Sequence, residues 1–226
     1  MSVLILYYKV TPERISSAQL SEQIAKWLEE LPSEKQLRIN KLHQQKDRVL
    51  SLVGLQLLKV AMTDFSDMPF SLSQLQFPEQ TKPFFPSHID FNISHSGEIA
   101  CCVVSDSHNV GIDIELRRNV KETTLNKYLT ETTNALHGNN AEQNKQDFFN
   151  IWTKYEAIIK AANHGSIFHM KDIQLEANGG HYQNKFWYTY PVNIVSDEDN
   201  KEYTCHIACS EDIAAQNIKI RQIHNL

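Results

Sequence analysis

The chain has 226 residues, of which 41% are hydrophobic and 22% charged, an ordinary globular composition that allows one large domain or two small ones. Its 22 basic and 27 acidic residues give a formal net charge of −5, which argues against nucleic-acid binding. No apolar run approaches the ~20 residues of a membrane span, and the first residues lack the basic and apolar regions of a signal peptide.

The chain is predicted to begin with one strand followed by three helices. Thr11-Pro12 places a capping residue before a proline at the first helical position. Ser33 and Gln36 have the pattern of a capping box at the start of a second helix. These signals and the apolar spacing after them predict a strand at 3–8 and helices at 12–31, from 33 onward and at 47–63.

After residue 70 the apolar period changes from helical spacing to alternation, which predicts strands. A proline-framed loop at Thr81–Pro86 follows the first of them. One long helix interrupts the strands, because apolar residues from Phe148 to Ile159 share one face. We predict strands at 75–77, 91–95, 99–104 and 110–115, a helix at 143–162, and then mostly strands, broken at 178–180 and by an acidic loop at 196–200.

Four cysteines lie in apolar, strand-like runs. They have neither the C-x-x-C spacing of a zinc site nor the density of a disulfide scaffold. We therefore expect reduced core cysteines in a cytoplasmic protein that binds neither membrane nor nucleic acid. The cysteines are Cys101, Cys102, Cys205 and Cys209.

A short similarity suggests internal duplication. The tripeptides at 99–101 and 207–209 are both Ile-Ala-Cys, and each precedes a polar turn and an alternating segment, at 110–115 and 216–221. Duplication would give two similar α+β halves, of which only the first keeps acids on the polar face. Chance similarity between two amphipathic strands explains the match equally well.

Asp113 and Glu115 are separated by one residue in a predicted strand. Alternation places both carboxylates on one face, about 7 Å apart, with Ile112 and Ile114 on the other. Two carboxylates at this spacing can reach one hard cation, directly or through water. Taken alone, the pattern is also typical of a half-exposed strand with solvated acids.

Two further segments carry polar chemistry. Glu156 and Lys160 are four residues apart, so they share a helix face, which by itself is typical of a surface ion pair. His95 stands between Ser94 and Ser96 at a predicted strand end, where a structural histidine is the plain alternative. Neither serine lies in the G-x-S-x-G elbow of a hydrolase.

Together the three segments are far more specific than any one of them. F-N-I-S-H-S is followed about 15 residues later by G-I-D-I-E, and about 40 residues beyond by W-T-K-Y-E-A-I-I-K. Their order and spacing resemble the 4′-phosphopantetheinyl transferase family, and within it the pseudo-dimeric Sfp-type branch that modifies carrier domains of peptide and polyketide synthases. The resemblance covers nearly the whole chain.

The resemblance implies an α+β fold of two similar halves related by a pseudo-twofold axis. Each half would be an antiparallel sheet flanked by helices, with the active site between the halves. We expect an N-terminal half at 1–115, with His95, Asp113 and Glu115, and a C-terminal half at 116–226, with Glu156 and Lys160. Because the duplication supplies both halves, we expect a monomer.

The resemblance also implies a magnesium-dependent enzyme of the holo-[carrier-protein] synthase type. It would transfer the 4′-phosphopantetheine arm of coenzyme A (CoA) to a serine of an apo acyl or peptidyl carrier protein and release 3′,5′-ADP. Asp113, Glu115 and Glu156 resemble the magnesium ligands of the family. Glu156 is the expected general base, and Lys160 is the expected second catalytic residue and a phosphate ligand.

The remaining family roles concern CoA. His95, with Ser94 beside it, resembles the residue that contacts the 3′-phosphate. Lys82 resembles the lysine of a K-P motif near the nucleotide, and Lys35 and Arg38 resemble basic residues that reach the 3′-phosphate. A family arginine about four residues before Gly54 is absent here, where Leu50 stands, and we expect Arg48 to take over its phosphate contact.

A second departure leaves other functions open. The family often has a lysine directly before the helix glutamate, where this chain has Tyr155, and Lys154 points about 100° away. This departure allows an inactive CoA- or carrier-binding module, although all three metal carboxylates are present. A metal-dependent phosphohydrolase using the same acids is a third class, but it normally needs a second metal site.

Overall fold

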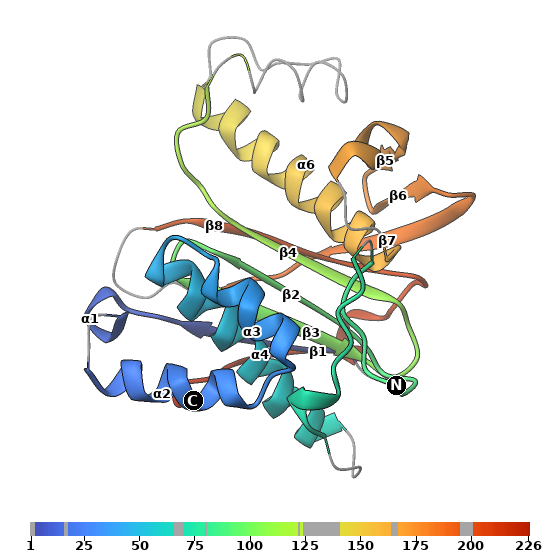
Figure 1. Cartoon of the computed structure of the whole chain (residues 1–226). Coiled ribbons are helices and arrows are strands. Elements are labelled where there is room, and N and C mark those ends of the chain that lie inside the picture. Colours follow the sequence, from blue (N-terminus) through green and yellow to red (C-terminus); the bar gives the residue numbers. More distant parts are fainter. Residues whose placement is uncertain are drawn as a thin grey trace.

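The computed structural model of the protein describes residues 3–15, 18–65, 70–79, 81–121, 123, 141–163, 167–194 and 201–226. Within them lie helices and two β-sheets, which confirms the predicted α+β class. The loop expected at 196–200 lies outside the described residues. The elements labelled in Figure 1 are β1 (Val3–Lys9), α1 (Pro12–Ile15), α2 (Ala18–Glu29), α3 (Ser33–Asn40), α4 (Gln45–Phe65), β2 (Asp90–Ser96), β3 (Ile99–Ser105), β4 (Val110–Leu116), α6 (Ala141–Ala161), β5 (Gln174–Glu176), β6 (Gly179–Tyr182), β7 (Lys185–Pro191), β8 (Tyr203–Cys209) and β9 (Ile218–Gln222).

The strand predicted at 75–77 is wrong. The described residues form only an isolated bridge there, between Gln76 and Phe84. Pro78 and Pro86 occupy the next hydrogen-bonding positions on either side of this bridge and have no N–H to donate, which disfavours a longer ladder. The segment is instead anchored by Leu75 and Phe77, which are buried in the core.

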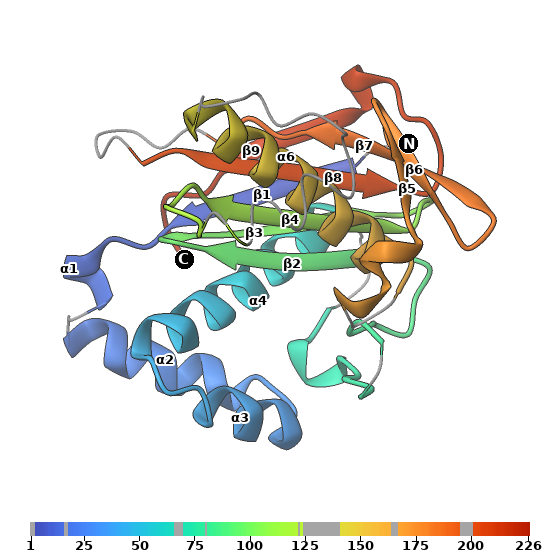
Figure 2. The same ribbon diagram turned by 90° about the horizontal axis from the view of Figure 1, so that it is seen from above.

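The sheets have strand orders β2-β3-β1-β9 and β4-β8-β7-β6-β5. All their pairs are antiparallel except β1 with β9, which run parallel. The two sheets are stacked, with α2, α3 and α4 on the outer side of the first and α6 on the outer side of the second (Figures 1 and 2). The first sheet is therefore buried on both faces in its centre.

The sequence of β1 explains this position. Its alternate residues Leu4 and Leu6 enter the cluster under α4, whereas Val3 and Ile5 enter the cluster between the sheets. A strand with two buried faces reads as a continuous apolar run rather than an alternating one. The four cysteines are free and buried, as predicted, and three of them lie in the cluster between the sheets.

Both sheets contain a three-strand unit of the same order. β1 pairs with β3 and β3 with β2, just as β4 pairs with β8 and β8 with β7, and all these pairs are antiparallel. The Ile-Ala-Cys tripeptides do not occupy equivalent places in these units. Ile99 pairs with Lys9, the last residue of β1, whereas Ile207 pairs with Ile112, the third residue of β4.

The expected division after residue 115 does not coincide with the division between the sheets. β4, which carries Asp113 and Glu115, belongs to the second sheet, and the C-terminal strand β9 belongs to the first. The acids of β4 and the helix α6 therefore lie on the same sheet. What the first sheet brings to them is its edge strand β2.

Candidate active site

The face of β4 that carries Asp113 and Glu115 lies under α6. Ile112 and Ile114 point the other way, into the cluster between the sheets, as the strand alternation predicts. Gly111 begins this polar face and allows the close approach of the helix. A Cβ atom at Gly111 would lie 2.1 Å from the carbonyl oxygen of Ala157 and 2.5 Å from the nitrogen of Ala161.

Lys160 joins the strand acids to the helix acid. Its Nζ lies 2.6 Å from Oδ1 of Asp113 and 3.8 Å from Oε2 of Glu156. Asp113 is only 4% exposed, so this ammonium is its main source of compensating charge. Burial, the largest influence on the pKa of Lys160, lowers it, but the attraction of Asp113 and then of Glu156 outweighs burial and leaves the pKa raised.

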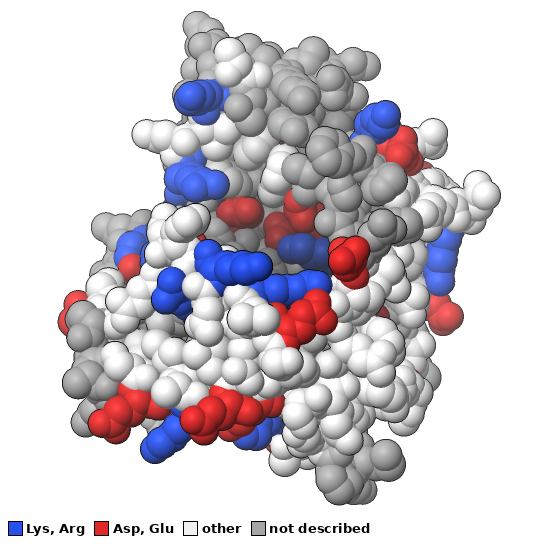
Figure 3. Space-filling model, viewed as in Figure 1, with Lys and Arg blue, Asp and Glu red and all other residues white. Residues whose placement is uncertain are grey.

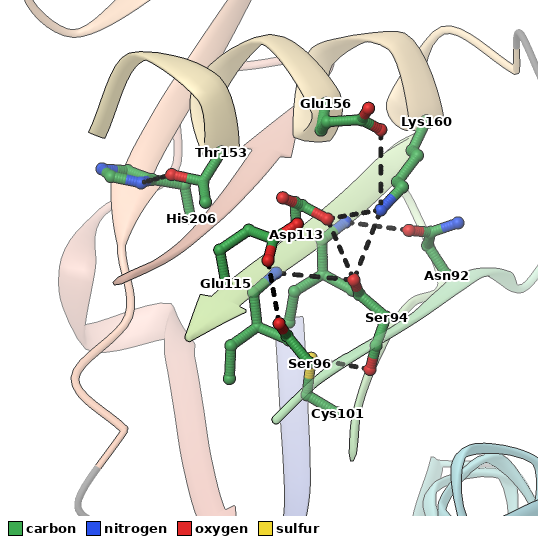
Figure 4. A network of polar contacts seen from close by, with 12 residues as sticks. Asn92, Ser94, Ser96, Cys101, Asp113, Glu115, Thr153, Glu156, Lys160 and His206 are labelled. Carbon is green, nitrogen blue, oxygen red and sulfur yellow. Dashed lines mark hydrogen bonds and ion pairs between the residues drawn. The ribbon is translucent and has the colours of Figure 1, made fainter. Parts of the chain in front are cut away.

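Two serines of β2 contact the strand acids (Figure 4). Ser94 Oγ donates to Oδ1 of Asp113 at 3.0 Å and accepts from Lys160 Nζ at 3.3 Å. Ser96 Oγ donates to Oε2 of Glu115 at 2.8 Å. The structure thus brings Asp113, Glu115, Glu156 and Lys160 together in one polar cluster, as predicted. Ser94, which was expected beside His95 at the CoA phosphate, and Ser96, for which no role was predicted, are further members of this cluster.

Both glutamates of the cluster hold their protons more tightly than free glutamate does. Burial is the largest cause and raises the pKa of each. The positive charge of Lys160 lowers the pKa of Glu156, whereas the negative charges of Asp113 and Glu115 raise it. For Glu115, the hydrogen bond from Ser96 lowers the pKa and the charge of Asp113 raises it. Crowded carboxylates of this kind are stabilised by cations.

The cluster has the donor chemistry of a magnesium site. Oδ2 of Asp113 is buried and has no hydrogen-bond partner among the described residues, and a buried carboxylate oxygen needs such a partner or a cation. The same part of the chain contains no group of three or more His, Cys, Asp or Glu side chains arranged to hold a metal ion. The residues present fit an ion that also takes oxygens from a substrate and water.

His95 lies beside the cluster, between two cavities. Its Nε2 is 3.4 Å from Oγ of Ser51. Burial, the largest cause, lowers the pKa of His95, with smaller contributions from Lys160 and Lys35 that Asp47 opposes. One cavity, of about 520 Å³, also reaches Glu115 and Ser96; the other, of about 190 Å³, also contains Lys35.

The other predicted CoA residues are placed differently. Lys35 lies over the ring of Phe77, 5.0 Å from its centroid, and its pKa is lowered mainly by burial. Arg38 pairs with Glu34 at 2.5 Å and reaches the backbone oxygen of Phe77 at 3.5 Å. Arg48 donates to the carbonyl of Leu42 at 2.7 Å and so fastens the turn after α3.

Lys82 makes buried contacts with Asp90 and Val110 and does not line either cavity beside His95. Its Nζ is 2.5 Å from Oδ2 of Asp90 and 2.9 Å from the carbonyl oxygen of Val110. Its backbone N–H donates to the side chain of Asn163 at 3.0 Å, just past the end of α6. Lys82 therefore links the loop before β2 to β4 and α6.

Tyr155 and Lys154 both point away from the acidic cluster. Tyr155 is buried with Met170, Tyr182 and Trp187 between α6 and the strands β6 and β7. The Nζ of Lys154 donates to the carbonyl of Ala177 at 2.9 Å. The expectation that Lys154 does not replace the family lysine agrees with this contact.

Further basic and aromatic residues surround the acids. Figure 3 shows acidic side chains inside a hollow, with basic side chains along its rim. Lys46 and Arg118 line the 520 Å³ cavity, and Arg118 also lines an aromatic cavity of about 430 Å³ that extends from Glu115. Sequence reasoning missed both cations, because neither belongs to a motif and only the fold brings them to the cluster.

Comparisons with known proteins cover almost all of this chain. A family model described as "4′-phosphopantetheinyl transferase, N-terminal" matches residues 18–108, and one described as "4′-phosphopantetheinyl transferase superfamily" matches residues 109–208. Their boundary falls just before β4, where the second sheet begins.

Three relatives illustrate the similarity. The 4′-phosphopantetheinyl transferase gsp of Aneurinibacillus migulanus is 29% identical over 195 residues, which cover 84% of this chain and 80% of the relative. The 4′-phosphopantetheinyl transferase of Bacillus subtilis is 28% identical over 136 residues, 59% of this chain and 60% of the relative. The 4′-phosphopantetheinyl transferase HetI of a Nostoc species is 26% identical over 160 residues, 67% and 68%.

Proposed function

This chain belongs to the 4′-phosphopantetheinyl transferase superfamily, and we propose that it transfers the 4′-phosphopantetheine arm of CoA to a serine of a carrier protein. The observation that carries this proposal is the single cluster of Asp113, Glu115, Glu156 and Lys160 under α6. Three acids and one lysine beside a cavity with basic residues suit a pyrophosphate whose charge must be compensated during transfer.

CoA would lie across the two cavities beside His95. The 520 Å³ cavity runs from His95 and Lys46 to Glu115 and Arg118, so it offers cations at both ends to the phosphates. Lys35, in the smaller cavity with His95, supports the assignment of this region to the 3′-phosphate. Lys82 and Arg48 are in contacts that support the fold, so we assign them an indirect part in CoA binding.

The proposed cation is Mg²⁺, held by Asp113, Glu115 and Glu156. When bound, it would neutralise the pyrophosphate charge and polarise the phosphorus that is attacked. The unpartnered Oδ2 of Asp113 supports this role.

Glu156 is the proposed general base. Burial, the largest cause, raises the pKa of Glu156, which makes its carboxylate a better proton acceptor than that of a free glutamate. It would take the hydroxyl proton as the serine oxygen bonds to the β-phosphorus and the bond from that phosphorus to the 3′,5′-ADP oxygen breaks. Lys160, close to Asp113 and Glu156, would stabilise the negative charge on the transferred group and the leaving 3′,5′-ADP.

Two architectural proposals accompany the activity. The repeated three-strand units, each with a long helix, support a pseudo-twofold arrangement of two halves. A single chain supplies all the residues of the cluster, which supports a working monomer.

A cytoplasmic location stays a prediction. Within the described residues, no helix is both long and apolar enough to cross a membrane.

Release of 3′,5′-ADP tests the proposed reaction. The protein is incubated with CoA and Mg²⁺, with and without an apo carrier protein, and the nucleotides are separated by chromatography. Transfer predicts 3′,5′-ADP only when the carrier is present. Nucleotide release without carrier would indicate a hydrolase, and no release with any of several carriers would indicate a binding module.

A further inference from the structure

The two sheets meet along the edge strands β2 and β4, which belong to different sheets. Every second side chain of β2 accepts a hydrogen bond from a backbone N–H of β4, always twenty residues further along the chain. We call these four side chains the polar seam. The bonds are Val110 N to Asp90 (2.8 Å), Ile112 N to Asn92 (3.0 Å), Ile114 N to Ser94 (3.4 Å) and Leu116 N to Ser96 (3.0 Å).

The two serines of the polar seam also donate a hydrogen bond to an acid of β4. Each accepts the N–H of the residue after an acid and donates its own proton to that acid, Ser94 to Asp113 and Ser96 to Glu115. A serine hydroxyl has one proton, so both hydroxyls are fully oriented by these contacts. The Oγ atoms of Ser94 and Ser96 therefore fix both the register of β2 against β4 and the orientation of the Asp113 and Glu115 carboxylates.

Glu115 depends on this contact more than Asp113 does. Asp113 is also held by Lys160 at 2.6 Å, whereas the contact described for the Glu115 carboxylate is the 2.8 Å bond from Ser96. Glu115 has one more rotatable bond than aspartate and borders the open 520 Å³ cavity. Arg118 and Lys160 also attract the Glu115 carboxylate, but the Ser96 hydroxyl gives it a directional contact, and loss of that contact would open further rotamers.

We propose that Ser96 is a positioning residue for the transfer reaction: its hydroxyl holds Oε2 of Glu115 against the polar seam and keeps the second oxygen available to a divalent cation beside Asp113. This inference rests on the proposed function, because it assigns Glu115 to the cation. The sequence motif suggested no role for Ser96. The contact with Glu115 explains why a serine is suited to the last position of F-N-I-S-H-S (Figure 4).

The test is cation affinity, with Mn²⁺ as the probe in the presence of CoA. Free Mn²⁺ is measured by electron paramagnetic resonance during titration of the parent protein, Ser96→Ala, Ser96→Thr and Asn92→Ala. Loss of an outer-shell hydrogen bond commonly weakens metal binding 10- to 100-fold. We expect Ser96→Ala to raise the Mn²⁺ dissociation constant about tenfold, and Ser96→Thr, which keeps the hydroxyl, to stay within about threefold of the parent.

Asn92→Ala is the matched control, because it removes a polar-seam bond from a side chain that touches no acid of β4. We expect it to lower the melting temperature while its Mn²⁺ dissociation constant stays within about twofold of the parent. A Ser96→Ala protein that binds Mn²⁺ like the parent overturns the inference, as does an equal loss in Asn92→Ala or a parent that binds no Mn²⁺. Because the readout is binding, a parent that binds Mn²⁺ but transfers nothing overturns the proposed function and leaves standing only that Ser96 positions Glu115 for a cation.

Discussion

At the scale of single residues, His95 is the sharpest test of where CoA lies. It is placed between the cavity with Lys35 and the cavity that reaches Glu115. His95→Ala should raise the KM for CoA about tenfold, equivalent to about 1.4 kcal/mol, because one phosphate ligand is lost. The KM for the carrier should change less than about twofold, since the proposed role of His95 is toward CoA alone.

Steady-state kinetics with 3′-dephospho-CoA provide the control for His95. If His95 contacts the 3′-phosphate as proposed, the defect of His95→Ala should almost disappear with this substrate, which lacks that phosphate. Equal defects with CoA and with 3′-dephospho-CoA would remove the phosphate assignment and point to a structural role through Ser51, 3.4 Å away.

Tyr155 and Lys160 lie on different sides of α6. Tyr155 is packed among apolar side chains, whereas Lys160 lies within the acidic cluster. Tyr155→Phe should therefore lower kcat/KM by less than about tenfold, or 1.4 kcal/mol, and Lys160→Ala should lower it considerably more. Both variants are compared with the parent at saturating Mg²⁺, with melting temperatures as the folding control; the reverse ranking would give the tyrosine hydroxyl a direct catalytic part.

At the scale of elements, the packing of α6 on β4 depends on Gly111. Any side chain there meets the helix backbone, not a flexible side-chain end. Gly111→Ala should push α6 outward, separate Glu156 and Lys160 from Asp113, and lower both the melting temperature and kcat/KM, the latter by at least about 100-fold.

Gly180→Ala is the matched control for Gly111→Ala. The nearest atoms to a Cβ at Gly180 are 3.1 to 3.2 Å away, and two of them are side-chain ends. We expect it to keep kcat/KM within about threefold of the parent. Equal activities for Gly111→Ala and the parent would mean that the spacing of α6 and β4 does not govern the reaction.

Local patterns predicted β2, β4 and α6 because each has a clear period, and the same periods placed Asp113 beside Glu115 and Glu156 beside Lys160. They did not reveal the polar seam. In β2 the alternate residues Asn92, Ser94 and Ser96 looked like an ordinary polar face, and their partner strand lies in another sheet. A bond between side chain and backbone at a sheet edge leaves no periodic mark on the partner's sequence.

At the scale of the whole molecule, buried histidine links stability to pH. His206 on β8 lies against Thr153 of α6, with Nδ1 2.8 Å from Oγ1, and burial, followed by Lys154, lowers its pKa from 6.5 to about 3. Below pH 6.5, His206 binds a proton in the unfolded chain but stays neutral in the folded protein until the pH approaches 3. The stability gained from a neutral His206 is therefore complete above pH 6.5 and is lost as the pH falls towards 3.

Denaturant unfolding at several pH values measures this linkage. Between pH 6 and pH 4, His206 should contribute up to about 1.4 kcal/mol of lost stability for each pH unit. His206→Gln, which does not titrate, should show a correspondingly shallower loss over that range than the parent. Equal slopes in the two proteins would show that His206 is not held neutral in the fold.

Long-range topology was the least predictable feature of this molecule. We expected two halves that divide after residue 115, whereas the division between the sheets falls before β4, and the C-terminal strand β9 joins the first sheet. Both strands are amphipathic segments whose partners are set by packing between distant parts of the chain. Lys82 binds two groups that only the packing of β2 against β4 brings together, the carboxylate of Asp90 and the carbonyl of Val110. Its predicted contact with the nucleotide stays a prediction.

The mass of an intact apo carrier protein, measured after incubation with this protein, CoA and Mg²⁺, tests the central claim most directly. We expect a gain equal to one phosphopantetheine on the carrier and no gain on a carrier whose acceptor serine is alanine. Asp113→Asn, which keeps the side-chain volume but removes the charge next to Lys160, should leave the carrier unmodified and should also lower the melting temperature. An unchanged carrier mass with the parent protein, across acyl and peptidyl carriers, would show that this protein is not a phosphopantetheinyl transferase.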